Sequence, residues 1–488
     1  MPSLFNLLGT NLRSVMYSLS VDRDLALSIA RQLTGQLRAL ILDGKLTAGA
    51  RLPPTRVLAS ELGIARNTVI QVYEQLIAEG YLTGRTGSGT YVVDLTQYGA
   101  SRAVSTPGNS GGGVPGRPAG EGIISFDAGA VDYMRFPRAA WVRALRDACL
   151  DMPDSGFAWC APSGDADLRR ELSAYLYRAK DISCSPEQIL ITPGATGGAD
   201  LLAWALRSET NRVAMEDPCV HFIREAFRRN RYDVAPVPVD EQGMRTRMLA
   251  GMSGVSLIYA VPSHQFPTGR VLSIRRRLEM LDFARGCGAY IVEDDYDSEF
   301  RYEGEPIQSL RHLDAERVIY LGSFSKIFSP TLRIGYMIAP REVLDRVRAC
   351  MESVNQTVPA LLQQTLAAYI SSGQLERHIY RMRKCYARKR LHLIAELRKA
   401  FGASVRISGE NAGMHLLAQF NISVTGGGFE DILRGHGVEA DCADEYALNK
   451  GQYADCLVLG YGGLEKAQIS EGVRRIKAAL DEYALGKR

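Results

Sequence analysis

From about residue 123 onward, short apolar runs alternate with stretches of helical periodicity. The runs are rich in β-branched residues and read PEQILITPG, NRVAMEDP, VSLIYAVP, AYIVEDDY and RVIYLGSFS. Buried strands of this kind, separated by helices, are typical of a mostly parallel sheet covered on both faces. From about residue 341 the pattern changes to long helices and then to a small α+β tail. We therefore predict an α/β body with a mostly parallel seven-stranded sheet and a small C-terminal domain.

The first ninety or so residues predict three helices and a hairpin. The segment LALSIARQLTGQLRALILDGKL has helical spacing and stops near Gly44. A short helix is expected over Thr55 to Leu62 with Thr55 as its cap, and Gly63 makes a turn into a helix from about Ala65 to Glu79. A hairpin follows from Tyr81 to Val93. Two helices joined by so short a turn predict a helix-turn-helix, whose second helix reads the groove of DNA.

Between these two parts the composition shifts to LTQYGASRAVSTPGNSGGGVPGRPAGEG, which has almost no large apolar side chain. Such a segment buries too little surface to offset its ordering entropy, so we expect a flexible linker. The predicted organisation is a winged-helix head over 1–94, a linker over 95–122 and a body over 123–488. Within the body we expect a large domain over about 123–370 and a small domain over about 371–488.

Composition narrows the class of protein. Apolar residues make up 46% and charged residues 23%, and no run of 18 apolar residues is present to span a membrane. The N-terminus lacks the pattern of a signal peptide, so we expect a cytoplasmic protein. The nine cysteines form no C-x-x-C pair, which argues against a disulfide framework or a structural zinc site and favours reduced packing residues. A net charge of +4 is too small to indicate a nucleic-acid partner.

The case for DNA rests on the residues of the helix-turn-helix itself. Arg66, Asn67 and Thr68 lie on the first turn of the second helix, where side chains and amides meet phosphates and base edges. In the hairpin, glycines allow close approach to the duplex and Arg85 supplies charge. The strings LPPTR, LA-x-x-LG-x-x-RNTV, L-x-x-EGYL and G-x-GTYV resemble the GntR-type winged-helix regulators. That resemblance implies binding of double-stranded DNA through Arg56, Arg66, Asn67, Thr68 and the wing around Gly89.

The body contains candidates for holding pyridoxal 5'-phosphate (PLP). This cofactor needs a lysine amine, a cradle for its phosphate and a carboxylate that keeps the pyridine nitrogen protonated. Lys326 follows the strand VIYLG, in the loop where an α/β fold places ligands. Nearby hydroxyl, guanidinium and helix-start amide donors suit a phosphate, and they come from Ser323, Ser325, Arg333, Ala195, Thr196 and Gly197.

The other two groups follow the strand AYIVED. Asp294 stands at its end, placed to reach the ring nitrogen, and Tyr296 is a candidate hydrogen-bond donor to the phenolic oxygen of the cofactor. Each of these signals is weak alone. Their occurrence together, each at the carboxyl end of a strand, favours a PLP site.

The strings PSHQFPTG, EDDYDSEFRY and GSFSK-x-x-x-P-x-LR-x-GY resemble the fold type I PLP enzymes. With the head attached, the chain resembles the MocR family of regulators over nearly its full length. The resemblance implies that Lys326 forms the Schiff base with PLP, that Asp294 binds the pyridine nitrogen, and that Tyr296 and His264 lie near the ring oxygen. It implies Ser323, Ser325 and Arg333 on the phosphate, Phe222 or His221 stacked on the ring, and a homodimer.

The chain also departs from aminotransferases of this fold. Phe266 stands where they commonly have asparagine, and the helix after PGAT begins GGAD. No arginine occurs between Gly435 and Val473, where the arginine that holds a substrate carboxylate is expected. We therefore do not expect a complete transamination cycle.

Three functions remain open at this point. The favoured one is a PLP-dependent transcriptional regulator whose body senses PLP or an amino compound and repositions the head. The second is an active aminotransferase with a tethered DNA-binding domain. The third is a regulator whose body has lost PLP and serves only in dimerisation. The effector, the operator and the choice between activation and repression cannot be read from the residues.

Overall fold

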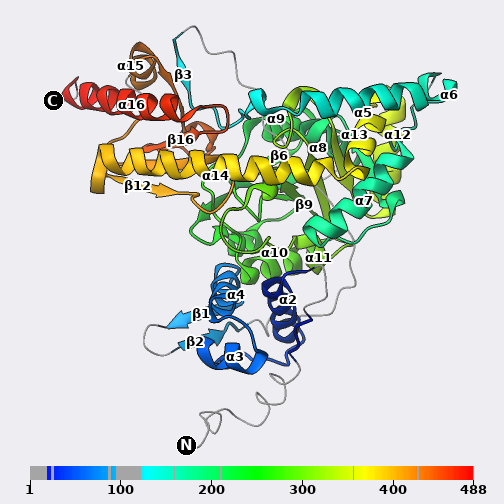
Figure 1. The fold of residues 1–488 in the computed structure, drawn as a ribbon, viewed down its shortest axis with the longest axis horizontal. Coiled ribbons are helices and arrows are strands. Elements are labelled where there is room, and N and C mark those ends of the chain that lie inside the picture. The colour runs from blue at the N-terminus through cyan, green and yellow to red at the C-terminus, as the bar shows by residue number, and fades with distance from the viewer. Residues whose placement is uncertain are drawn as a thin grey trace, which may run out of the picture.

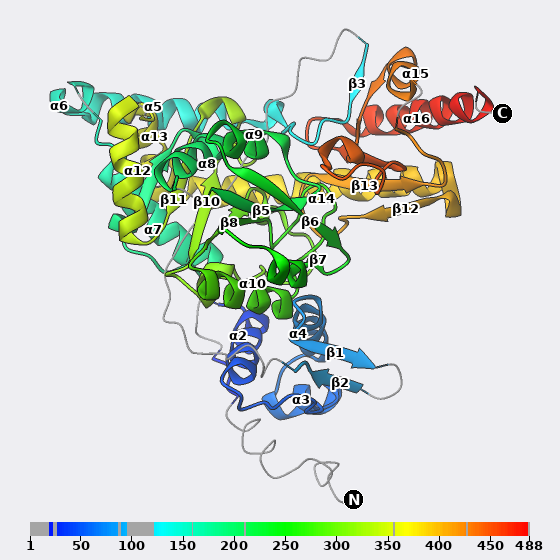
Figure 2. The same ribbon diagram turned by 180° about the vertical axis from the view of Figure 1, so that it is seen from behind.

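The computed structural model of the chain describes residues 19–22, 27–85, 89–94, 122–158, 160–208, 211–354, 357–425 and 428–486. A small head lies beneath a larger body (Figures 1 and 2). The predicted linker, 95–122, falls outside the described residues apart from Gly122. No helix within the described ranges is both long and apolar enough to cross a membrane.

The head has the predicted helix-turn-helix and hairpin. Its elements are α2 (Ile29–Leu42), α3 (Thr55–Leu62), α4 (Arg66–Ala78) and the antiparallel strands β1 (Leu82–Arg85) and β2 (Gly89–Val92). Gly63 ends α3 in the left-handed conformation at φ 61°, which suits glycine and makes the sharp turn into α4. The prediction that Thr55 caps α3 is wrong. Pro54 occupies the cap position, and the Thr55 hydroxyl accepts a hydrogen bond from Arg66 Nε at 3.4 Å.

The body is built on one large sheet, whose strands lie in the order β4, β11, β10, β9, β8, β5, β6 and β7. Their bounds are Ile189–Thr192, Gly335–Ile338, Val318–Ser323, Tyr290–Asp295, Val255–Ala260, Arg212–Asp217, Asp233–Asp240 and Gly243–Met244. The strands from β10 to β6 are parallel, whereas β11 is antiparallel to both of its neighbours. The predicted mostly parallel sheet is confirmed, and the two-residue β7 adds an eighth strand at its edge.

Helices cover both faces of this sheet (Figures 1 and 2). One buried cluster joins the sheet to α8 (Gly194–Ala205), α9 (His221–Arg229) and α12 (Arg341–Val354). Another joins it to α5 (Arg138–Asp151), α7 (Ala166–Lys180) and α13 (Ala360–Ser371), and a third to α10 (Ile274–Cys287). A sheet covered in this way exposes its ligand-binding groups at the carboxyl ends of its strands.

The small domain follows the long helix α14 (Gln374–Phe401). Its antiparallel sheet holds β12 (Val405–Ser408), β13 (His415–Phe420), β16 (Cys456–Gly460) and β15 (Asp441–Cys442), with α15 (Phe429–Gly435) and α16 (Lys466–Gly486) beside it. The short β3 (Ile124–Ser125) pairs in parallel with β14 (Val438–Glu439). The start of the body therefore runs alongside the small domain before it enters the large one.

The head rests on α10 of the body (Figure 2). Ile274 and Leu278 of α10 are buried in the same hydrophobic cluster as the head's own core. The backbone N–H of Ile274 donates to the Glu79 carbonyl at 2.5 Å, and the Glu79 carboxylate is held by the buried Arg38, whose Nε lies 2.7 Å from it. The C-terminal end of α4 is therefore docked on the body, while Arg66 at its other end is exposed.

Candidate functional site

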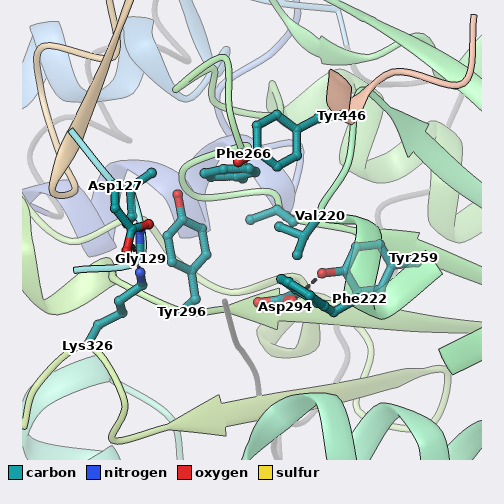
Figure 3. Close-up of a pocket in the computed structure, with 12 residues that line it drawn as sticks. Asp127, Gly129, Val220, Phe222, Tyr259, Phe266, Asp294, Tyr296, Lys326 and Tyr446 are labelled. Carbon is teal, nitrogen blue, oxygen red and sulfur yellow. Dashed lines mark hydrogen bonds between the residues drawn. The ribbon is translucent and has the colours of Figure 1, made fainter. Parts of the chain in front are cut away.

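A cavity at the carboxyl ends of β9 and β10 brings together four of the predicted cofactor residues, Phe222, Asp294, Tyr296 and Lys326 (Figure 3). We call it the lysine cavity. Its lining consists of Asp127, Ala128, Gly129, Val220, Phe222, Tyr259, Val261, Phe266, Asp294, Tyr296, Lys326 and Tyr446. Carboxyl ends of parallel strands are where an α/β sheet binds ligands, so its position agrees with the fold.

Lys326 enters the lysine cavity from the loop that follows β10. It is 5% exposed, and its Nζ donates to the carbonyl of Ala128 at 2.9 Å. Burial lowers the pKa of this amine, against the opposing effect of the nearby carboxylates of Asp127 and Asp297. A lowered pKa increases the neutral fraction of the amine, which is the form that attacks a carbonyl.

Asp294 lies near the end of β9, with one carboxylate oxygen in a hydrogen bond and the other without a partner among the described residues. Its Oδ2 accepts a hydrogen bond from the hydroxyl of Tyr259, whereas its Oδ1 is buried and has no hydrogen-bond partner among the described residues. Burial raises the pKa of Asp294 to about 7, and the Tyr259 hydrogen bond opposes that rise. An unpaired buried acceptor costs free energy, which a donor such as a protonated ring nitrogen would recover.

Tyr296 lines the lysine cavity between Asp294 and Lys326 (Figure 3). Its hydroxyl lies 3.0 Å from Nδ1 of His264, and the same Nδ1 lies 3.0 Å from Oδ2 of Asp297. His264 is buried but does not itself line the cavity. Of the two residues expected near the ring oxygen, Tyr296 faces the cavity and His264 supports it from behind.

The structure distinguishes between the two residues predicted to stack on the cofactor ring. Phe222 lines the lysine cavity, whereas the neighbouring His221 is exposed and is not part of the lining. Their rings are 3.6 Å apart between centroids. Phe266, where the resemblance predicted asparagine, also lines the cavity and packs edge to face on Tyr446 at 4.9 Å.

The predicted phosphate donors lie around the start of α8. Ser323 donates from its hydroxyl to that of Ser325 at 2.7 Å and accepts from the Ser325 amide at 2.9 Å. Arg333 donates to the carbonyl of Pro193 at 3.0 Å, just before α8 begins. The first turn of α8 contains Ala195, Thr196 and Gly197. Unpaired amides at a helix start attract anions, so this arrangement suits a phosphate.

Several lining residues were not predicted from the sequence. Asp127, Ala128 and Gly129 follow β3 and carry no recognisable motif, and Tyr446 reaches the cavity from the small domain. Tyr259 does have a signal, because it lies near the end of a strand that neighbours β9. Lys326 is the one cationic side chain among the described lining residues.

The predicted DNA contacts form an exposed surface on the head, which we call the recognition face. Arg66 and Asn67 are exposed at the start of α4, Thr68 is half-buried beside them, and Arg56 is exposed on α3. Gly89 is exposed at the start of β2, where it pairs with Arg85 in the hairpin. A side-chain carbon at Gly89 would lie 2.9 Å from Nε of Arg51, so glycine at this position allows Arg51 to lie against the hairpin. Arg51 was not among the DNA contacts predicted from the sequence.

Comparison with known families finds two matches along the chain. Residues 29–92 match the family of bacterial regulatory proteins, gntR family. Residues 121–438 match the family aminotransferase class I and II.

Several relatives match nearly the whole chain, and two of them show the pattern. One is the uncharacterized HTH-type transcriptional regulator YdeL of Bacillus subtilis, 32% identical over 94% of this chain and 98% of that protein. The other is the probable rhizopine catabolism regulatory protein MocR of Rhizobium meliloti, 33% identical over 95% of this chain and 96% of that protein.

Solved structures match the body. An archaeal alanine:glyoxylate aminotransferase is 27% identical with a TM-score of 0.69, covering 74% of this chain and 91% of that one. The α-aminoadipate aminotransferase LysN of Thermus thermophilus, solved with N-(5'-phosphopyridoxyl)-L-leucine, is 26% identical with a TM-score of 0.68, covering 75% of this chain and 94% of that one.

Proposed function

The chain belongs to the MocR branch of the GntR-type transcriptional regulators, which join a helix-turn-helix head to an aminotransferase-like body, and we propose that it is a PLP-dependent one. The proposed signal is PLP itself or an amino compound that reacts with it. The observation that carries this proposal is the pairing of buried Lys326 with the unpartnered Oδ1 of Asp294 in one cavity.

The residues of the lysine cavity fit PLP group by group. Bound PLP supplies an aldehyde that reacts reversibly with primary amines and a ring that withdraws electrons. Lys326 offers the amine, and Asp294 offers a buried acceptor for the ring nitrogen. Tyr296 offers a hydroxyl for the phenolic oxygen, with His264 and Asp297 fixing its orientation. Phe222 offers a face for stacking.

The proposed phosphate cradle completes the fit. Ser323 and Ser325 offer hydroxyls, Arg333 offers a guanidinium, and Ala195, Thr196 and Gly197 offer the amides of the start of α8. These donors lie at the end of β10, in the segment that follows it, and on the first turn of α8 after β4, so they would hold the phosphate close to the sheet.

We propose sensing rather than turnover as the role of the body. Within the described lining, Lys326 alone is cationic, so one chain offers no guanidinium there to orient the carboxylate of an amino-acid substrate. The alternative, an active aminotransferase with a tethered DNA-binding domain, has a direct test. Full-length protein loaded with PLP is mixed with a panel of amino donors. Stoichiometric release of keto acid, with loss of the cofactor absorbance, would support turnover and contradict pure sensing.

We also propose that the regulator is a homodimer. The support in this chain is a set of exposed apolar side chains along α5 and its neighbours, where Met134 is 82% exposed, Leu150 76% and Val142 61%. Apolar side chains gathered on one face commonly mark an interface. Sedimentation velocity of the wild type is expected to show a dimer, and Leu150→Asp is expected to shift it toward monomer. A monomeric wild type would contradict the proposal.

The test of the whole proposal uses full-length protein and PLP. Borohydride reduction is expected to fix the cofactor on the protein, and peptide mapping is expected to place it on Lys326. The same preparation is expected to bind the promoter of a neighbouring gene more tightly than random DNA of equal length, in a salt-sensitive way. Labelling at another lysine, or equal affinity for the two DNAs, would contradict the proposal.

A further inference from the structure

A second cavity lies where the head, the large domain and the small domain meet. We call it the junction cavity. Its walls are Ala78 at the end of α4, Glu241, part of the loop 263–271 and Arg301 of the large domain, and residues 407–412 of the small domain. Its volume is about 310 Å³. The junction cavity is thus separate from the lysine cavity and large enough for a small molecule.

Two buried polar groups of this cavity lack partners. His264 is 3% exposed, and its Nε2 has no hydrogen-bond partner among the described residues. Its other nitrogen, Nδ1, is already engaged by Tyr296 and Asp297, so Nε2 is the atom left for a ligand. Nε of Arg301 is also buried without a partner. Unpartnered buried groups in a polar cavity indicate a place where a ligand supplies the missing contacts.

The charged side chains that line the junction cavity are not all in ion pairs. Arg270 pairs with Glu241 at 3.3 Å, and Glu410 pairs with Arg398 at 2.9 Å. Arg301 has no ion pair with any described residue. One guanidinium is therefore left without a partner, and its matching ligand is a carboxylate or a phosphate.

Arg301 also lies beside the docked end of the recognition helix. A side-chain carbon placed on Gly304 would lie 3.4 Å from Nη2 of Arg301 and would collide with Oε1 of Gln75, so the two groups are close neighbours. Gln75 in turn donates to Glu79, the residue whose carbonyl accepts from the Ile274 amide. Burial lowers the pKa of Arg301, and the charge of Glu79 opposes that effect, which means that the guanidinium and the head's carboxylate attract each other.

We propose that the junction cavity is a binding site for a small multivalent anion, a dicarboxylate or a phosphate compound, held by Arg301 beside the buried His264. An anion on Arg301 offsets the attraction between this guanidinium and the nearby Glu79 carboxylate, and so weakens the docking of α4 on α10. Because α4 carries the recognition face at its other end, the bound anion acts on how the head is presented to DNA. His264 lines the junction cavity and also supports Tyr296 of the lysine cavity, so this one residue connects the two cavities.

Calorimetric titration of the full-length chain, kept in PLP, tests the site with inorganic phosphate and with succinate against sodium chloride at equal ionic strength. The wild type is expected to bind at least one of the two saturably, and the preferred probe identifies the class as phosphate or dicarboxylate. Arg301→Gln is expected to weaken binding by about tenfold or more, because it removes a charge-assisted contact. Arg341→Gln is the matched control, since Arg341 is 93% exposed on α12, and it is expected to change nothing.

Further variants separate this site from the phosphate cradle and from misfolding. Binding lost in Arg333→Gln but kept in Arg301→Gln would place the anion in the cradle and overturn the proposal. If Arg301→Gln fails to fold, the pair Ala78→Glu and Ala78→Gln replaces it, because Ala78 is exposed on α4 and only the glutamate repels an anion. Weaker binding in Ala78→Glu alone supports the site, and equal binding in the pair overturns it.

Hydrogen exchange reports the proposed effect on docking. The amide of Ile274 bonds to the carbonyl of Glu79 across the interface between head and body, so its exchange rate measures docking. Saturating anion is expected to speed exchange at this amide in the wild type and to leave it unchanged in Arg301→Gln. Unchanged or slower exchange in the wild type with anion bound would overturn the proposed loosening.

Discussion

The lysine cavity and the recognition face present their chemistry in opposite ways. In the lysine cavity the important groups are buried, and burial itself prepares them, since it lowers the pKa of Lys326 and raises that of Asp294. On the recognition face Arg56, Arg66 and Asn67 are exposed to solvent. In the lysine cavity the fold itself changes the pKa values of the functional groups. On the recognition face the residues are expected to act only when DNA is bound.

This contrast predicts different sensitivities. A buried group that loses its charge or shape changes the free energy of ligand binding strongly, because its neighbours have no water to replace it. An exposed contact is one of several and is screened by salt. The variants below test that difference, from the largest expected effect to the smallest.

Asp294→Asn is expected to weaken PLP binding by about 10- to 100-fold, since a hydrogen bond to a charged group is worth about 1.5–3 kcal/mol. The pKa of Asp294 in the cofactor-free chain is raised to about 7 by burial. Its ionised, accepting form therefore predominates only above that pH. The ratio of wild-type to variant affinity should grow as pH rises from 6 to 8.5 in absorbance titrations. A ratio near one at every pH would contradict the assigned role.

Arg66→Ala is expected to weaken binding to the operator by about tenfold and to reduce the slope of log affinity against log salt by about one if the contact is to a phosphate. PLP binding is expected to be unchanged, which separates the two regions. Fluorescence anisotropy at several salt concentrations measures the effect. Arg341→Ala serves as the control, because it removes an exposed arginine of the body. An equal loss in both variants would indicate bulk charge rather than the recognition face.

Phe222→Ala is expected to lower PLP affinity by a few-fold to about tenfold, because an aromatic contact is worth about 0.5–1.5 kcal/mol beyond buried area. His221→Ala is the matched control next to it, and it is expected to have no effect because His221 lies outside the lining of the lysine cavity. Titration of both variants with PLP settles which ring stacks. The reverse result would assign stacking to His221.

Periodicity and motif together predicted most of the fold. The strand that contains Asp294 and the strand that ends shortly before Lys326 were predicted because each begins with a buried apolar run rich in β-branched residues. The strand β6 was not predicted, since Pro236 and Pro238 break the usual strand composition; only Ala235, Val237 and Val239 on its other face are buried. Prolines are tolerated near a sheet edge, and β6 has only the two-residue β7 beyond it.

Site residues that lie at the end of a strand were predicted from the sequence. Site residues that are brought in by segments distant along the chain were missed. Lys326, Asp294 and Tyr296 come together because neighbouring parallel strands end at one edge. Asp127 and Tyr446 reach the same cavity only because β3 runs beside the small domain. The docking of Glu79 on Ile274 joins segments almost 200 residues apart, and no local pattern predicts such a contact.

The central claim is that one buried amine joins cofactor binding to the response of the head. The most direct test compares wild-type protein with Lys326→Ala, measuring both borohydride-fixed absorbance and the change in promoter affinity when PLP is added. The account predicts that the variant loses the fixed absorbance and the PLP-dependent change while it still binds the promoter. A variant that keeps both the absorbance and the PLP response would contradict it.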